Sequence, residues 1–136
     1  MTTGLRVGVV VAQEFDLHLR DVEAALAAEH HVTRFHRRRT AAPIAATRID
    51  RARLDRDLAR LMREHDVVLF EWAEEEFVRA THLPTRCPIV VRLHLHELWD
   101  FLPQADLAAV ARLITVSQAM ERKVLLRHPE DAGGDA

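Results

Sequence analysis

The densest group of chemically reactive side chains in this sequence lies between residues 92 and 100. The stretch reads RLHLHELWD and contains two histidines, a glutamate, an aspartate and an arginine. It directly follows residues 89–91, whose β-branched side chains are typical of a parallel strand covered on both faces. Ligands of open α/β sheets bind just beyond the carboxyl ends of the strands. The sequence therefore predicts a functional site where this strand ends.

Several side chains near this strand end are of types that suit catalysis or binding. An imidazole titrates near neutral pH, so His94 is a candidate general base. Glu97 could accept hydrogen bonds from ligand hydroxyl groups or influence a neighbouring histidine. Trp99, like Trp72 earlier in the chain, could stack on a sugar ring or another flat apolar surface. These residue types indicate a ligand that carries hydroxyl groups and an apolar face.

Two further strand ends carry residues that the fold would bring close to His94. Glu71 and Trp72 end one predicted strand, and Ser117 follows another. Because the carboxyl ends of parallel strands meet at one edge of a sheet, these side chains can converge on one cleft. A structural interpretation also stays open at this point, in which Glu71 only pairs with Arg92 and Trp72 belongs to the core.

Metal binding and acyl transfer are less well supported by the spacing. His94 and His96 are two residues apart, so both imidazoles face the same side of an extended strand. Glu97 becomes a third ligand only if the chain turns there, and two good ligands do not make a tight zinc site. Ser117 stands where a helix cap is expected, and the sequence has no Gly-x-Ser-x-Gly elbow. We therefore expect neither a metal nor another cofactor.

The composition is that of a single soluble domain. The 136 residues are 49% hydrophobic and 29% charged, with a formal net charge of −2. This balance gives no overall field that would attract nucleic acid. The single cysteine, Cys87, excludes an internal disulfide and suits a reducing compartment. No apolar run approaches the roughly 20 residues that span a bilayer. We expect a cytoplasmic protein with one domain over residues 1–127 and a polar tail over residues 128–136.

Strand and helix patterns alternate along the chain. Short apolar runs predict strands at residues 5–12, 31–35, 66–72, 89–93 and 113–116. Apolar residues at helical spacing, N-cap residues and Pro103 predict helices at residues 15–28, 51–64, 74–82 and 103–110, and another after Ser117. Asp16 and Asp50 are the expected N-caps of the first two. This alternation predicts an α/β, Rossmann-like three-layer sandwich with a five-stranded parallel sheet in the order 3-2-1-4-5. The expected core strand residues are Val9, Val10, Val68, Leu69, Val90 and Val91.

Two loop segments bear on anion binding. The first crossover reads AQEF at residues 12–15 and has no glycine to bring backbone N–H groups close to a phosphate, which Glu14 would also repel. Arg37, Arg38 and Arg39 could contact a phosphorylated ligand or an anionic lipid. A run of like charges is more often a solvated surface, and we favour that interpretation. The first crossover is therefore a poor nucleotide site.

Three segments of the chain form a familiar set when they are taken in order. They read DVVLFEWAEE at residues 66–75, PIVVRLHLHELWDF at residues 88–101 and ARLITVSQAMERKVL at residues 111–125. The most specific pieces are Glu71-Trp72, the run from Arg92 to Glu97, and the ITVS that ends at Ser117. Together these segments resemble the N-terminal half of a family 4 glycosyltransferase of the GT-B type. The resemblance extends from residue 5 to about residue 127.

This resemblance implies a division of roles between two domains. GT-B enzymes have two facing Rossmann domains, of which the N-terminal one mainly holds the acceptor and the C-terminal one mainly holds the nucleotide-sugar donor. By analogy, His94 is the catalytic residue near the reacting sugar, Glu97 lines the acceptor side, and Glu71 lies beside them. Ser117 would cap the helix that faces the cleft. The other expected acceptor contacts are Trp72, Arg92 and Trp99.

Two departures from that family shape the functional expectation. The glycine-rich first loop is replaced by residues 12–15, and no donor-binding half is present in the 136 residues. We therefore expect the acceptor-binding domain of a split or truncated glycosyltransferase, inactive alone, because one half cannot orient both substrates or exclude water. Its expected partners are a sugar or glycoside acceptor and either a donor-binding domain or subunit or a second copy of the chain. The alternative is a non-catalytic α/β interaction module that keeps the fold without the activity.

Overall fold

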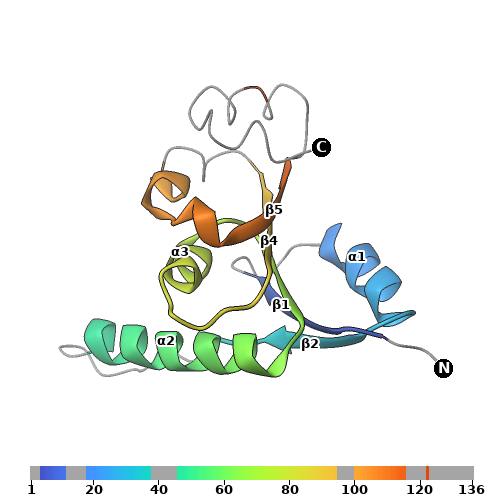
Figure 1. Cartoon of the computed structure of the whole chain (residues 1–136), viewed down its shortest axis with the longest axis horizontal. Helices are drawn as coiled ribbons and strands as arrows, with labels where there is room; N and C mark the ends of the chain where they lie inside the picture. The colour runs from blue at the N-terminus through green and yellow to red at the C-terminus, as the bar shows by residue number, and fades with distance from the viewer. Residues whose placement is uncertain (1–3, 12–17, 38–45, 95–99, 116–121, 123–136) are drawn as a thin grey trace.

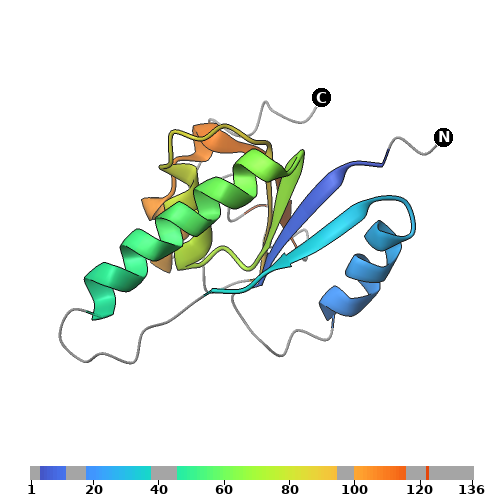
Figure 2. The same cartoon turned by 90° about the horizontal axis from the view of Figure 1, so that it is seen from below.

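The chain folds around a five-stranded parallel sheet in the order β2-β1-β3-β4-β5 (Figure 1). This computed structural model describes residues 4–11, 18–37, 46–94, 100–115 and 122. Helix α1 lies on one face of the sheet, and α2 and α3 lie on the other (Figures 1 and 2). The elements are β1 (Arg6–Val11), α1 (His18–Ala27), β2 (His31–Phe35), α2 (Ala46–Glu64), β3 (Val67–Glu71), α3 (Glu75–Thr81), β4 (Ile89–Leu93), the 3₁₀ turns η1 (Leu102–Gln104) and η2 (Leu107–Ala109), and β5 (Val110–Thr115). The structure therefore confirms the α/β, Rossmann-like class and the parallel sheet.

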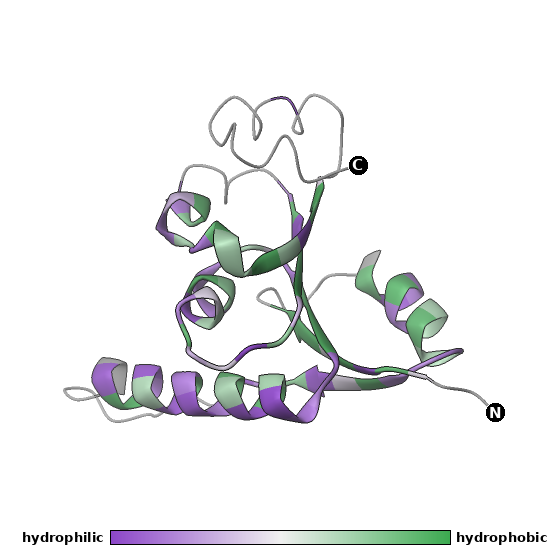
Figure 3. Cartoon of the chain, viewed as in Figure 1, coloured by the Kyte–Doolittle hydropathy of each residue, from purple (hydrophilic) through white to green (hydrophobic). Residues whose placement is uncertain are grey.

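Apolar side chains on the two faces of the sheet form two core clusters. The larger cluster packs the sheet against α2 and α3 and includes Val10, Leu58, Phe70, Phe77 and Val91. The smaller cluster packs Val7 and Val9 of β1 against Leu19 of α1. Strands in Figure 3 are accordingly mostly green, whereas the helices alternate between green and purple, as expected when only one helical face is buried.

The strand order differs from the predicted 3-2-1-4-5, because β3 lies between β1 and β4 instead of beyond β2. The burial of the two strands explains the difference. All five residues of β3 are buried or half-buried, as a central strand requires. In β2, by contrast, His31, Thr33 and Arg34 are exposed, which suits an edge. The direction of the crossovers therefore changes between β1 and β3, and such switch points are where ligands of doubly wound sheets bind.

Two predicted helices differ from the observed ones. Helix α2 begins at Ala46, so Asp50 lies inside the helix and is not its N-cap. The predicted helix over residues 103–110 is replaced by two 3₁₀ turns. The first turn begins at Leu102, one residue before the predicted start at Pro103. Ala105 is then extended with ψ of 152°, and the Asp106 carboxylate caps the second turn by accepting the Ala108 N–H at 3.2 Å. Strand β5 consequently begins at Val110, three residues before the predicted start at 113. The Asp16 cap and the helix after Ser117 lie outside the described residues.

Two of the six predicted core residues are less buried than expected. Val9, Val10, Val68 and Val91 are buried, but Leu69 and Val90 are half-buried. Leu69 pairs with Val9 and Val90, and all three lie on the face that carries α1. Because α1 packs on β1 and β2, the described residues cover β4 less fully on this face. Ile114 of β5, on the same face, is 44% exposed.

One irregularity interrupts the otherwise regular pairing of β4. The register between β4 and β5 shifts between Ile89 and Val90, at the amino end of the strand. The extra residue is Ala111 of β5, and a bulge of this kind disrupts the ladder locally and bends the strand that contains it. Beyond it, residues 90–93 pair in regular register with β5, and β3 pairs with β4 along its other side.

None of the helices within the described ranges combines the length and the apolar character needed to cross a membrane.

Candidate functional site

A buried carboxylate stands at the carboxyl end of β3. The side chain of Glu71 is 0% exposed, and its Oε1 accepts a hydrogen bond from Nε2 of His94 at 2.6 Å. Nη1 of Arg92 lies 3.6 Å from the same oxygen. The parallel register causes this arrangement, because Glu71 and Arg92 are paired on adjacent strands, and His94 follows Arg92 by two residues on the same side, just past the end of β4. Arg92 therefore compensates the buried charge, and Glu71 in turn fixes the orientation of the His94 ring.

The backbone of Trp72 is strained where β3 ends. Its φ is 77°, which makes it the single non-glycine residue with positive φ among the described residues. For a bulky side chain this conformation is unusual and costs on the order of 1–3 kcal/mol. The Trp72 N–H donates to the carbonyl oxygen of Arg92 at 3.2 Å, which ties the strained residue to β4.

This strained conformation directs the indole of Trp72 onto His94. The two ring centroids are 3.6 Å apart and the ring planes differ by 15°, so the rings are stacked. His94 is thus held by a carboxylate at Nε2 and by an aromatic ring on one face. Backbone strain that serves to position a side chain is characteristic of functional sites. The Trp72 side chain is half-buried, so the purely core role that the sequence left open does not describe it.

A carboxylate paired with a histidine can perform acid–base chemistry. The carboxylate orients the ring and stabilises the imidazolium that forms when the ring takes up a proton. Because Nε2 donates to Glu71, proton transfer between His94 and a ligand would use Nδ1. The His94 side chain is 16% exposed, so part of it is accessible to a ligand. The site lies beside the β1/β3 switch point, since Val11 of β1 pairs with Glu71.

The structure brings together four of the seven predicted site residues, namely Glu71, Trp72, Arg92 and His94. The other three, Glu97, Trp99 and Ser117, lie outside the described residues, as does His96 of the possible metal pair. Among the residues that the structure does describe, no cluster of three or more His, Cys, Asp or Glu side chains could hold a metal ion.

An ion-pair cluster that sequence reasoning missed lies at the same edge of the sheet. Arg37, just after β2, is only 14% exposed, and its Nη1 donates to Glu76 at 2.9 Å and to Glu75 at 3.2 Å. The interpretation of Arg37 as a solvated charge is therefore wrong, because the acidic first turn of α3 pairs with it. Burial alone would lower the pKa of Arg37, but the hydrogen bonds with Glu76 and Glu75 outweigh it and raise the pKa. The three consecutive glutamates at 74–76 were the available signal; Arg38 and Arg39 lie outside the described residues.

A second pair anchors α3 to α2. The guanidinium of Arg79 binds Asp55 with two parallel hydrogen bonds of 2.7 Å. Such bidentate pairs fix geometry as well as contributing energy. Together with Arg37, this pair holds the helix that immediately follows Trp72, so the strained turn at the site is supported from both ends of α3.

Comparison with known proteins adds no assignment to this geometry. No protein-family model matches the chain, and a search of curated protein sequences found no match either. The function considered below therefore depends on the residues of the site, the fold and the sequence segments described above.

Proposed function

We propose that this chain is a glycosyltransferase-like acceptor-binding domain that works with a donor-binding domain or subunit. The observation that carries the proposal is the orientation of His94 by Glu71 and Trp72 at the carboxyl ends of β3 and β4. The proposal is further supported by the three sequence segments that resemble family 4 enzymes, two of which contain these residues. A Rossmann-like fold is compatible with it but is shared by many unrelated functions.

The proposed chemistry assigns one role to each of four residues. A hydroxyl oxygen of the acceptor attacks the anomeric carbon of the donor sugar, and the nucleoside diphosphate leaves with the bonding electrons. Nδ1 of His94 takes the hydroxyl proton as the new bond forms. Glu71 stabilises the resulting imidazolium, and the guanidinium of Arg92 lies 3.6 Å from Glu71 and compensates its negative charge. Trp72 holds the ring in place, which is a positioning role and differs from the acceptor contact expected from the sequence.

The proposal requires that the donor be held elsewhere. The sequence of the first crossover offers Glu14 and no glycine, so this chain lacks the usual backbone cradle for a diphosphate. A partner domain must therefore supply donor binding and close the site to water. The chain alone is expected to bind an acceptor and to transfer nothing.

Side-chain NMR of the purified chain tests this assignment. A panel of monosaccharides, simple glycosides, and uridine and guanosine diphosphate sugars would be titrated while the imidazole and indole signals are followed. We expect at least one sugar or glycoside to shift the signals of His94 and Trp72, and the nucleotide sugars to leave them unchanged. His94→Ala should remove the response and keep the amide spectrum of the fold, whereas His31→Ala, an exposed histidine on the edge strand, should retain it.

Two results would contradict the proposal. Micromolar binding of a nucleotide sugar by the isolated chain would place the donor on this domain. Absence of any response across sugars and glycosides would favour the alternative, a non-catalytic interaction module in which Glu71, Arg92 and His94 only stabilise the strand ends.

A further inference from the structure

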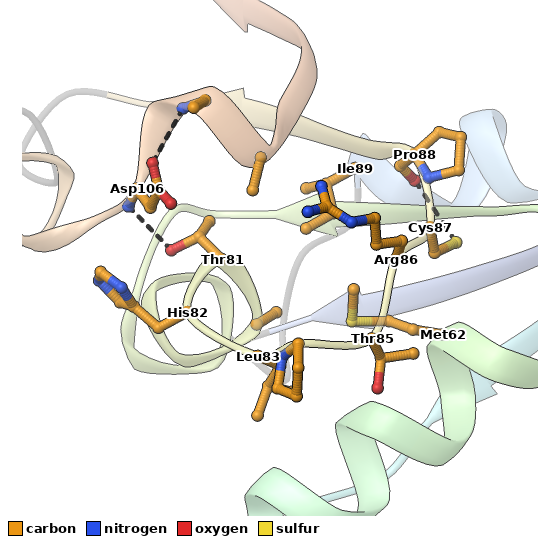
Figure 4. A pocket seen from close by; sticks show the side chains of 14 residues that line it. Met62, Thr81, His82, Leu83, Thr85, Arg86, Cys87, Pro88, Ile89 and Asp106 are labelled. Atoms are coloured by element: carbon orange, nitrogen blue, oxygen red, sulfur yellow. Dashed lines mark hydrogen bonds between the residues drawn. The ribbon is translucent and has the colours of Figure 1, made fainter.

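A cavity lies at the opposite edge of the sheet from Glu71 and His94, at the amino ends of β4 and β5. Its volume is about 620 Å³, and the residues that define it include Met62, Thr81, Arg86, Cys87, Ile89 and Asp106 (Figure 4). We refer to it as the amino-edge pocket. Its volume lies in the range of pockets that hold small organic molecules. It is separate from the site at Glu71 and His94, which lies at the carboxyl ends of the strands.

The walls of the amino-edge pocket are held by packing and hydrogen bonds. Met62 and Ile89 are buried core residues at the base of the pocket, and the half-buried Leu83 and Ala109 add accessible apolar surface to its lining. On another side, Oγ1 of Thr81 donates to the carbonyl oxygen of Val78 at 2.6 Å and accepts the backbone N–H of Asp106 at 3.0 Å. The Asp106 carboxylate is itself engaged in capping η2. The pocket is therefore preformed, which reduces the entropic cost of filling it.

One cation in the pocket is not used by the fold. The exposed side chain of Arg86 points toward the middle of the pocket in Figure 4. Within the described residues, Arg86 makes no hydrogen bond or ion pair, unlike Arg37 and Arg79, which both bind carboxylates. A guanidinium presents several N–H donors in a planar fork that matches a carboxylate or phosphate. Arg86 lies beside the apolar lining of the pocket. A ligand with an acid group and an apolar body would match both features.

We propose that the amino-edge pocket binds a small organic anion, with its acid group on Arg86 and its apolar body against Met62 and Ile89. The two charges in the pocket determine this orientation. Asp106 repels an acid group from the side of η2, so the acid group binds at Arg86. The site is independent of the acceptor site, because it uses none of the same residues and lies at the other edge of the sheet.

Cys87 provides a site-specific reporter for this pocket. It is the single cysteine of the chain, it lines the pocket, and it is half-buried. Burial, and after it the negative charge of Asp66, raises the pKa of the Cys87 thiol. The thiol is therefore a slow nucleophile whose alkylation rate reports access to the pocket and not an activity of the site.

Two probes that share an eight-carbon chain and differ in a charged or neutral head group test the proposal, namely octanoate and 1-octanol. Calorimetry would measure binding, and the rate of Cys87 alkylation by iodoacetamide with and without probe would locate it. We expect octanoate to bind saturably, to protect Cys87, and to bind about tenfold more tightly than 1-octanol, as one charge-assisted hydrogen-bonded contact implies. Arg86→Gln should weaken octanoate binding by about the same factor and leave 1-octanol binding unchanged.

Three variants complete the test. Ala108→Trp, at an exposed position in the pocket wall, should block both probes, and Asp106→Asn should tighten octanoate binding because it removes the like charge and keeps a capping side chain. Arg63→Gln, an exposed arginine on α2 outside the pocket, is the matched control and should change nothing. The proposal is overturned if octanoate fails to bind or to protect Cys87, or if Arg86→Gln binds octanoate as tightly as the original chain does.

Discussion

The strain at Trp72 leads to a prediction about the order of stability of two variants. Trp72→Gly and Trp72→Ala both remove the indole and its stacking on His94, so the two variants differ only in the residue that must adopt φ of 77°. Glycine adopts positive φ without a steric penalty, whereas alanine does not. At a position with ordinary negative φ the glycine variant is the less stable of the two, by roughly 0.4–1 kcal/mol, because a chain with glycine gains more conformational entropy on unfolding.

The expected difference follows from these opposing terms. The left-handed conformation costs a non-glycine residue roughly 1–2 kcal/mol, and the unfolded-state entropy of glycine offsets roughly half of this. We therefore expect Trp72→Gly to be more stable than Trp72→Ala by about 1 kcal/mol. Both should be less stable than the original chain, since an aromatic pair contributes roughly 0.5–1.5 kcal/mol beyond its buried area.

Urea denaturation followed by circular dichroism measures this difference through the transition midpoint at constant slope. Arg56 on α2 is exposed and provides the control, because there the alanine variant should be more stable than the glycine variant by about 1 kcal/mol, as in any exposed helix interior. Equal stability of the two Trp72 variants, or a more stable alanine variant, would refute the argument that the backbone is strained at this residue.

Three further predictions concern the charged groups and the proposed chemistry. Arg92→Gln removes the guanidinium beside the buried Glu71 carboxylate and should lower the free energy of unfolding by roughly 1–3 kcal/mol, measured in urea. If the loss comes from the uncompensated Glu71 charge, adding Glu71→Gln should recover part of it. Purely additive effects of the two substitutions would contradict this explanation. The pKa of Asp66 is lowered by hydrogen bonds from the backbone N–H of Arg6 and then from its guanidinium. The Asp66 carboxylate therefore stabilises the fold above the ordinary carboxyl pKa, and this stabilisation is lost as the pH falls through the lowered pKa. Asp66→Asn should flatten the acid side of a plot of unfolding midpoint against pH, and an unchanged slope would exclude Asp66 as a source of the acid sensitivity. In a reconstituted transferase, His94→Ala should abolish sugar transfer while circular dichroism shows an intact fold, and retained transfer would remove His94 from the proposed chemistry.

The sequence predicted the strands well because their signal is local. Runs such as residues 66–72 and 89–93 are apolar and β-branched, and the structure forms β3 and β4 within them. The predicted order of the strands, 3-2-1-4-5, was wrong, because the order depends on which strands pair over long distances along the chain. The exposed residues of β2 were the clue that this strand belongs at the edge.

The candidate site was predicted in its residue types but not in its geometry. The proximity of Glu71 to His94 follows from the sheet edge that they share, and their register is a property of the pairing between β3 and β4. The positive φ of Trp72 and its stacking on His94 have no sequence signature, because tryptophan gives no sign of left-handed backbone. The buried Arg37 was missed because its partners, Glu75 and Glu76, belong to another element nearly forty residues away.

The irregular pairing next to Ile89 and Val90 lies on the β5 side of β4, whereas the β3 side is regular. The amino-edge pocket lies against Ile89, and the His94 site begins where the strand ends, so a single five-residue strand connects them. Between the two, residues 90–92 have paired neighbours on both sides, whereas the irregular pairing is at the pocket end. Because β3 and β4 stay in regular register, we expect a displacement caused by filling the pocket to be taken up on the β5 side, and the geometry of Glu71, Trp72 and His94 to stay the same whether the pocket is empty or filled.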